Sequence, residues 1–409
     1  MSKKFYGWYV VLINALIGCA ISTGFPQSSM TIPYLSKATQ ISQEALLFGD
    51  TIRTIGIIIS MMISGFVYKK LGARKTFLIG MILLIPPIVI IPYIKSLVVI
   101  YLLKFMQGMS VVIFPMFLII IMDWIEEQNR GISTAIFNGI FYGGAGIGGT
   151  FSGLIIANFG WIESYWALAI VQLVLAAIWL LTVKENKTNK TVEQNDTGER
   201  KKPVSFGQMI KMPILWMLVI GFISTTWSVQ AISVDMPLFA SYLGYDEIET
   251  GKILSAITLG ILSACIVSGK AGDFFASKSE NKGIARVNVF SIGCIIVIVS
   301  VTMLLLLDLT KFAVFYFTVL VFSFGASWGL GSFYSILPEI FDNETLPFAT
   351  GFIGGCGDAG MTLAPVAVGI VFGIKGYWTI GWGLCIVVAI FSVLACLMIV
   401  NNIRRTKRG

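Results

Sequence analysis

The stretch that decides the fold of this chain is Gly65-Phe66-Val67-Tyr68-Lys69-Lys70-Leu71-Gly72-Ala73-Arg74-Lys75. It contains four cations and separates two long apolar segments, 45–67 and 76–93. A polar stretch this short is too brief to connect two soluble domains. It is typical of a hairpin between two membrane-spanning helices, whose cations stay on one side of the bilayer.

Composition places most of the chain against lipid or other helices. Of the 409 residues, 56% are hydrophobic and only 12% are charged, and the mean hydropathy is +0.86. Soluble domains carry about 25% charged residues. The net charge of +8 comes from cations in short loops between apolar segments, which is the distribution that sets membrane orientation. We therefore expect no nucleic-acid partner.

Twelve apolar segments are long enough to cross a hydrocarbon core about 30 Å thick. They lie at 8–30, 45–67, 76–93, 97–122, 131–157, 162–183, 213–240, 251–268, 287–306, 312–337, 347–372 and 377–400. The polar stretch between the sixth and seventh has the charged composition of a flexible linker. The sequence predicts an all-α membrane protein with an N-terminal six-helix bundle (1–183), a cytoplasmic linker (184–211) and a C-terminal six-helix bundle (212–409).

The cations also predict the orientation of these helices. An even number of spans places both termini on one side of the membrane, and 22 of the 29 Lys and Arg residues fall on that side. The side richer in cations is the cytoplasm. We expect a multi-pass protein of the cell (inner) membrane with both termini cytoplasmic.

An internal repeat relates the two sets of spans. Four glycines recur at an offset of 216 residues: Gly139, Gly144, Gly153 and Gly160 correspond to Gly355, Gly360, Gly369 and Gly376. This constant offset indicates a duplication that makes the two bundles pseudo-symmetric. Glycines in membrane helices allow close helix packing.

Residues that catalyse reactions or bind metals are not grouped in this sequence. The six Cys residues all fall inside apolar segments without paired spacing, and the chain has no His. Such Cys residues are most simply read as small buried hydrophobes, and no nucleophile–base pair is recognisable. We expect no enzymatic activity, no metal and no cofactor, and any proton chemistry must use carboxylates.

Three ionisable residues fall deep inside apolar spans, where a charge costs roughly 2.5–3.5 kcal/mol on insertion scales. Arg53 and Lys104 each lie nine residues from the outer end of their span, or roughly 13 Å deep at the helical rise. Asp358 lies at similar depth from the other side. We therefore predict Arg53 and Lys104 as substrate-binding residues and Asp358 as a proton-coupling residue.

Each of these residues also has a structural interpretation. Asp50 precedes Arg53 by three residues, so the two can neutralise one another along one helix face, and Asp50 is a second proton-coupling candidate. Asp358 can equally form a salt bridge to Arg53 or Lys104. Asp235 lies close to the outer end of its span and is expected to be interfacial.

The hairpin resembles the loop between helices 2 and 3 of major facilitator superfamily transporters. The matching residues are Gly65, Lys69, Gly72 and Arg74, with Lys69 at the acidic position of the family pattern; Gly269 and Asp273 repeat part of it and keep the acid. The resemblance implies twelve helices in two pseudo-symmetric bundles, the major facilitator fold. It also implies that both loops act as conformational switches, and we expect Asp273→Asn to shift the conformational balance more than Lys69→Ala.

Further resemblances concern the cavity of that family. Leu103-Lys104-Phe105-Met106-Gln107-Gly108 resembles the Arg-x-x-Gln-Gly signature of helix four, whose cation lies at the central cavity. Spans one, seven and ten line this cavity in the superfamily. The resemblance therefore adds Gln27, Trp227, Gln230 and Trp328 as candidate substrate-binding residues, with helix packing as their alternative role.

The N-terminal segment resembles one branch of the family. Phe5-Tyr6-Gly7-Trp8-Tyr9-Val10-Val11 and Ile32-Pro33-Tyr34-Leu35 resemble the monocarboxylate and oxalate/formate porters, although Cys265 occupies the position of an Arg that those porters carry. This resemblance implies a secondary transporter of a small organic anion. The depth and charge of Arg53, Lys104 and Asp358 favour proton symport, and we expect a monomer. Anion/anion antiport and drug export by the same fold remain the alternatives.

Overall fold

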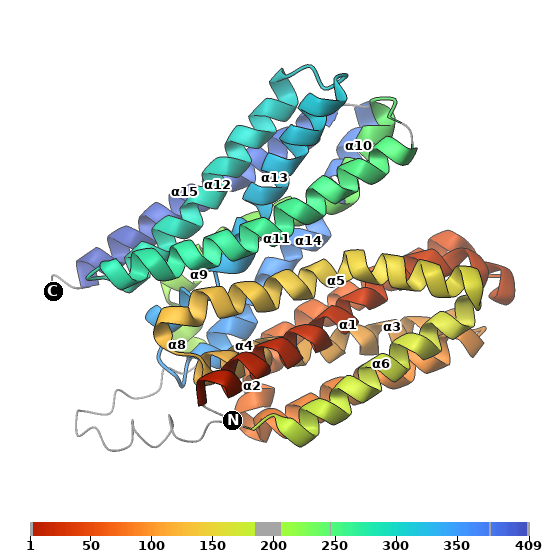
Figure 1. The fold of residues 1–409 in the computed structure, drawn as a ribbon, viewed down its shortest axis with the longest axis horizontal. Coiled ribbons are helices and arrows are strands. Elements are labelled where there is room, and N and C mark those ends of the chain that lie inside the picture. Colours follow the sequence, from red (N-terminus) through yellow and green to blue (C-terminus); the bar gives the residue numbers. More distant parts are fainter. Residues whose placement is uncertain (1–2, 185–205, 246, 376–377, 407–409) are drawn as a thin grey trace. The chain divides into compact units, whose positions relative to one another are not determined.

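The structure is a computed structural model that describes residues 3–184, 206–245, 247–375 and 378–406. These residues form helices, joined by short turns, and no strand (Figure 1). The elements are α1 (Lys3–Thr39), α2 (Gln43–Ile90), η1 (Ile91–Tyr93), α3 (Leu97–Met109), η2 (Ser110–Ile113), α4 (Phe114–Trp124), η3 (Glu127–Asn129), α5 (Arg130–Asn158), α6 (Trp161–Thr182), α8 (Phe206–Ile210), α9 (Pro213–Gln230), η4 (Ala231–Asp235), α10 (Met236–Tyr242), α11 (Glu247–Lys278), α12 (Lys282–Leu306), α13 (Phe312–Ser332), η5 (Leu337–Glu339), α14 (Leu346–Lys375) and α15 (Trp378–Thr406).

The helices confirm the prediction of an all-α, multi-pass membrane protein. Within the described ranges, nine helical stretches are long and apolar enough to cross a membrane. One of them, 45–93, has 49 residues, about 70 Å of helix, and so accounts for two of the predicted spans. The spans predicted at 131–157 and 347–372 fall on α5 and α14.

The hairpin quoted above lies inside α2, which is two helices joined at Gly72. The backbone of Gly72 has φ 75° and ψ 174°, outside the helical region. A positive φ of this size favours glycine, because a Cβ would be strained there. Gly72 therefore separates the two predicted spans of α2, 45–67 and 76–93.

The described residues divide into two compact units. Unit 1 comprises Met1–Glu127, Ile140–Pro203 and Thr350–Gly355, and unit 2 comprises Gln128–Gly139, Val204–Ala349 and Cys356–Gly409. In unit 1, α2 packs against α1, α3 and α6; in unit 2, α11 and α12 pack against α13, and α15 packs against α9 and α12. Most of the predicted linker, residues 185–205, lies outside the described residues.

The glycine repeat has the same packing role in each unit. In unit 1, a Cβ added at Gly144 of α5 would lie 2.6 Å from the carbonyl oxygen of Cys19 on α1. In unit 2, a Cβ added at Gly360 of α14 would lie 2.8 Å from the carbonyl oxygen of Ile223 on α9. Residues 216 positions apart thus allow two equivalent helix pairs to approach closely.

A second glycine contact brings α2 and α3 together beside the ionisable residues of unit 1. A Cβ added at Gly56 would lie 2.6 Å from the carbonyl oxygen of Phe105 and 3.1 Å from the Cα of Gly108. A Cβ added at Gly108 would meet the carbonyl oxygen of Arg53. This close approach sets the separation between Arg53 on α2 and Lys104 on α3.

We expect Gly56→Ala to destabilise the protein by about 1–3 kcal/mol, because overpacking forces the two backbones apart. Thermal unfolding of the purified protein in detergent measures the effect. Gly383→Ala is the matched control, since a Cβ at this helical glycine has nothing within 4 Å and alanine favours helix. A melting temperature of Gly56→Ala at or above that of Gly383→Ala would contradict the proposed close contact.

Candidate functional site

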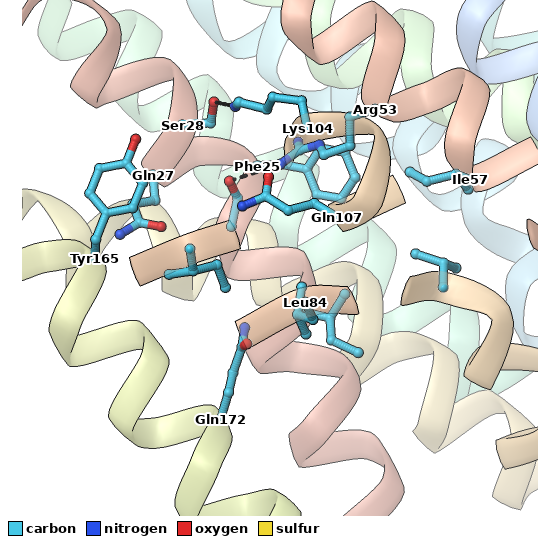
Figure 2. Close-up of a pocket in the computed structure, with 14 residues that line it drawn as sticks. Phe25, Gln27, Ser28, Arg53, Ile57, Leu84, Lys104, Gln107, Tyr165 and Gln172 are labelled. Carbon is cyan, nitrogen blue, oxygen red and sulfur yellow. Dashed lines mark hydrogen bonds between the residues drawn. The ribbon is translucent and has the colours of Figure 1, made fainter. Parts of the chain in front are cut away.

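A buried cluster of charged side chains lies in unit 1, where α1, α2 and α3 meet (Figure 2). The Lys104 Nζ donates to the Asp50 Oδ1 at 2.9 Å and to the Ser28 hydroxyl. The Ser28 hydroxyl in turn donates to the Asp50 carboxylate at 3.2 Å. Arg53, three residues after Asp50 on α2, has its Nη2 3.7 Å from the same carboxylate oxygen. The pair expected between Asp50 and Arg53 is therefore present, and Lys104 makes the closer contact.

Charge in this cluster is not balanced. Arg53 and Lys104 are 6% and 5% exposed, and both approach one carboxylate, Asp50. The residues that line the adjacent cavity include no further Asp or Glu. Two buried cations and one anion leave an excess positive charge, which is costly in a low-dielectric site unless an anion accompanies it. The arrangement therefore suits a bound anion.

Arg53 is held in place and keeps unused hydrogen-bonding capacity. Its Nη1 donates to the Gly24 carbonyl oxygen at 3.1 Å, and its guanidinium lies 3.6 Å from the centre of the Phe25 ring, a cation–π contact. Its Nε is buried without a hydrogen-bond partner among the described residues. A guanidinium that is fixed yet still has an unused donor is preorganised to bind a carboxylate.

The cavity beside these cations combines polar groups with an apolar wall. Its polar lining is Gln27, Ser28, Gln107, Tyr165 and Gln172 (Figure 2). Ile21, Ile57, Leu84, Ile88 and Val111 form most of the apolar side. About 20 Å³ is open to the centres of water molecules, which is room for about one water. A larger ligand requires side chains or helices to move apart.

The structure brings four of the predicted site residues together: Gln27, Asp50, Arg53 and Lys104. Gln27 donates from Nε2 to the Ser164 hydroxyl at 3.3 Å. Trp227, Gln230 and Trp328 belong to unit 2 and do not line this cavity. Trp328 donates from Nε1 to the Val289 carbonyl oxygen at 2.7 Å. The substrate-binding role of these three residues stays a prediction.

Sequence reasoning missed several residues of the cavity. Ser28, Phe25, Tyr165 and Gln172 come from α1 and α6, and no local pattern marks them as neighbours of Lys104. Gln107 could have been found, because it is the Gln of the Lys-x-x-Gln-Gly stretch and lies three residues after Lys104, on the same helix face. It is 8% exposed.

Asp358 lies in unit 2, on α14 where this helix packs against α9. Its neighbours Gly357 and Gly360 contact Phe222 and Thr226 of α9. Asp358 is 9% exposed, and its carboxylate has no ion pair within the described part of the chain. Its proton-coupling role stays a prediction.

Asp273 and Gly269, predicted in a loop, lie inside α11, and the turn to α12 follows only after Lys278. Asp273 binds the start of α5 within unit 2. Its carboxylate accepts hydrogen bonds from the amides of Gly131 and Ile132, each at 2.8 Å. It also pairs with the Arg286 Nη2 at 3.0 Å, and the Arg286 Nε lies 3.3 Å from Glu339. A carboxylate at a helix N-terminus satisfies free amides and interacts favourably with the helix dipole.

We expect Asp273→Asn to accelerate hydrogen exchange at the amides of Gly131 and Ile132 by about tenfold or more, since charge-assisted hydrogen bonds contribute roughly 1.5–3 kcal/mol. An amide side chain has one acceptor oxygen and cannot serve both amides and Arg286 as a carboxylate does. Exchange measured by mass spectrometry over residues 128–139 tests this expectation. Lys69→Ala, in the first hairpin, is the control. If hydrogen exchange over residues 128–139 accelerates equally in both variants, the expected role of Asp273 is contradicted.

Comparison with known proteins agrees with this architecture. Residues 10–284 match the family model described as Major Facilitator Superfamily. The "Probable galactarate/D-glucarate transporter GudP" of Bacillus subtilis is 22% identical over 76% of this chain and 72% of its own length. The "Nitrite extrusion protein" of Bacillus subtilis is 23% identical over 78% of this chain and 75% of its own length.

A solved structure supports the same fold. The crystal structure of the human organic anion transporter MFSD10 (TETRAN) aligns with a TM-score of 0.70, at 12% identity, over 98% of this chain and 100% of that chain. The predicted major facilitator fold is confirmed. With the family match extending over residues 10–284 and the membrane-spanning helices described above, the chain belongs to the Major Facilitator Superfamily.

Proposed function

We propose that this chain is a secondary active transporter of a small organic anion, which binds between Arg53 and Lys104 beside Asp50. The observation that carries the proposal is that two buried cations share one carboxylate, with Lys104 at 2.9 Å and Arg53 at 3.7 Å. A bound anion supplies the missing negative charge. The three similar proteins are named as transporters of galactarate or D-glucarate, of nitrite, and of organic anions, which supports an anionic substrate here.

The lining of the cavity favours a small carboxylate that also carries hydroxyl or carbonyl groups. The unused Nε of Arg53 and the Lys104 ammonium suit a carboxylate group. The amides of Gln27, Gln107 and Gln172 can each donate and accept, so they suit hydroxyl or carbonyl groups. A monocarboxylate-like substrate, as in the monocarboxylate and oxalate/formate branch, requires less widening of this small cavity than a larger anion does.

Proton symport is the mode of coupling that we propose. In this conformation Asp50 already accepts from Lys104 and Ser28, so it becomes available to a proton only after an incoming anion takes over Lys104. Asp358 has no ion pair in the described part of the chain, so its buried carboxylate can bind a proton without first losing a cationic partner, and we propose it as the carrier. In the alternative mode, anion/anion antiport, neither Asp50 nor Asp358 needs to bind a proton.

The membrane placement is part of the proposal. The cation-rich loops favour the cell membrane with both termini cytoplasmic, and the polar stretch 184–211 serves as a cytoplasmic linker between the bundles 1–183 and 212–409. Single-cysteine labelling from outside intact cells at residues 195 and 408 should fail at both positions. Labelling of either one would contradict this topology.

A thermal-shift screen of the purified protein tests the substrate class. A ligand that binds only the folded state raises the melting temperature. We expect small carboxylates to raise it in the wild type and in Lys95→Gln, an exposed lysine preceding α3, but not in Lys104→Gln. Stabilisation by quaternary ammonium compounds and not by carboxylates would favour drug export and overturn the proposal.

A further inference from the structure

The segment between α9 and α10 contains a π-helical turn, η4 (Ala231–Asp235), within unit 2. Two residues later stands Pro237, which has no amide hydrogen to donate to the carbonyl of Ser233. A regular α-helix cannot satisfy its backbone at that point, so the wider turn has a local cause. Turns of this kind are rare and are found frequently at functional sites. Asp235 is the last residue of this turn.

Asp235 is buried and has no ion pair among the described residues. Its interfacial depth, expected from its place near the end of the span, stays a prediction, and its side chain is only 4% exposed. Its Oδ2 is buried and has no hydrogen-bond partner among the described residues. The sequence did not reveal this burial, because depth along a helix does not show which helices cover its face.

The elements packed against η4 are α9, α10 and α13, and α15 packs against α9. The first three contain no Lys or Arg, and the arginines of α15 lie in its last turns. Lys252, on α11, is exposed and lies 5.8 Å from the centre of the Phe312 ring. The titratable groups on α10, α13 and α15 are Tyr242, Tyr316, Cys385 and Cys396. In the part of the chain that the structure describes, no cation of these elements pairs with Asp235.

Aromatic rings of α10 and α15 pack against one another next to η4 in the chain. Phe239, four residues after Asp235, has its ring centre 5.5 Å from that of Trp382 and 5.2 Å from that of Trp378. Trp382 is 1% exposed, and its indole N–H has no hydrogen-bond partner within the described ranges. Asp235 thus precedes a helix, α10, whose Phe239 packs against the aromatic rings of α15. A hard metal cation requires several oxygen ligands, which this surrounding does not offer.

We propose that Asp235 is a proton-binding site of unit 2, which holds its proton as a carboxylic acid in this conformation. An ionised carboxylate buried without a partner is strongly disfavoured, whereas the neutral acid is not. When the transport cycle admits water to the turn, the O–H bond breaks, the proton passes to water and Asp235 remains as a carboxylate. This site consists of other residues than the anion cluster of unit 1 and is distinct from Asp358.

Infrared spectroscopy of the full chain in lipid tests the proposal without a substrate. We expect Asp235→Asn to remove the carbonyl-stretch intensity of one protonated carboxylic acid at neutral pH, and the variant to keep the melting temperature of the wild type, because a neutral amide replaces a neutral acid. Asp308→Asn, at an exposed carboxylate, is the control and should leave the band of protonated carboxylic acids unchanged. An unchanged carboxylic-acid band in Asp235→Asn would overturn the proposal.

Tryptophan fluorescence gives an independent measurement. The wild type should show a pH-dependent change that Asp235→Asn abolishes and Trp382→Phe reduces, while Asp358→Asn retains it. A change that persists in Asp235→Asn, or one produced by adding sodium chloride in place of potassium chloride at constant pH, would overturn proton binding at Asp235. Failure of the substrate screen would affect the anion site alone, so the two proposals are separately testable.

Discussion

Lys104→Gln is expected to weaken binding of the transported anion by about 100-fold, since loss of one partner in a buried charged pair costs roughly 2–5 kcal/mol. Lys104 is 5% exposed and provides the shorter of the two cation contacts to Asp50. Without it, Asp50 and Arg53 neutralise one another and the cavity no longer has an excess positive charge. Binding should be weaker than in the wild type at every pH, because glutamine does not acquire a charge at any pH.

Binding measured by calorimetry, with the carboxylate that gives the largest thermal shift, checks this expectation. Lys104→Arg keeps the charge and should retain most of the affinity, although its planar fork needs more room. Lys95→Gln removes an exposed lysine and should bind as the wild type does. If Lys104→Gln is folded and binds with wild-type affinity, Lys104 is a structural partner of Asp50 and not a ligand of the substrate.

Asp358→Asn is expected to abolish uptake driven by a pH gradient while preserving exchange of substrate across the membrane. Asparagine resembles the protonated acid in shape and charge but cannot release a proton. A carrier with this side chain can still alternate with substrate bound, but proton movement through Asp358 is lost. Proteoliposomes with an inward proton gradient measure uptake, and preloaded proteoliposomes without a gradient measure exchange.

Asp308, which lies outside the membrane-spanning helices, provides the control variant for Asp358→Asn. Hydrogen bonds from Thr310 hold the pKa of Asp308 below its usual value, so Asp308 stays ionised at the pH of the assay and Asp308→Asn should leave both activities intact. Gradient-driven accumulation that survives in Asp358→Asn would exclude Asp358 as the proton carrier. Loss of accumulation in Asp235→Asn as well would agree with two proton sites.

Several features of the fold could be predicted from the sequence alone. The positions of the helices, the hairpin at Gly72 and the repeat at an offset of 216 residues were all predicted from local properties. Hydropathy decides which segments enter lipid, and the helical rise gives the depth of a residue such as Arg53 along its own span. The contact between Asp50 and Arg53 was also predictable, because three residues along a helix place two side chains on one face.

The tertiary structure decided how charges on different helices combine. That Lys104 on α3 and Ser28 on α1 both reach Asp50 on α2 depends on which helices pack together and on glycines such as Gly56 that let them approach. The burial of Asp235 depends in the same way on the packing of α9, α10 and α13 against η4. Helix pairing arises from many contacts between segments distant in sequence, so the hydropathy and spacing of one segment determine that a charge enters the membrane but not what compensates it there.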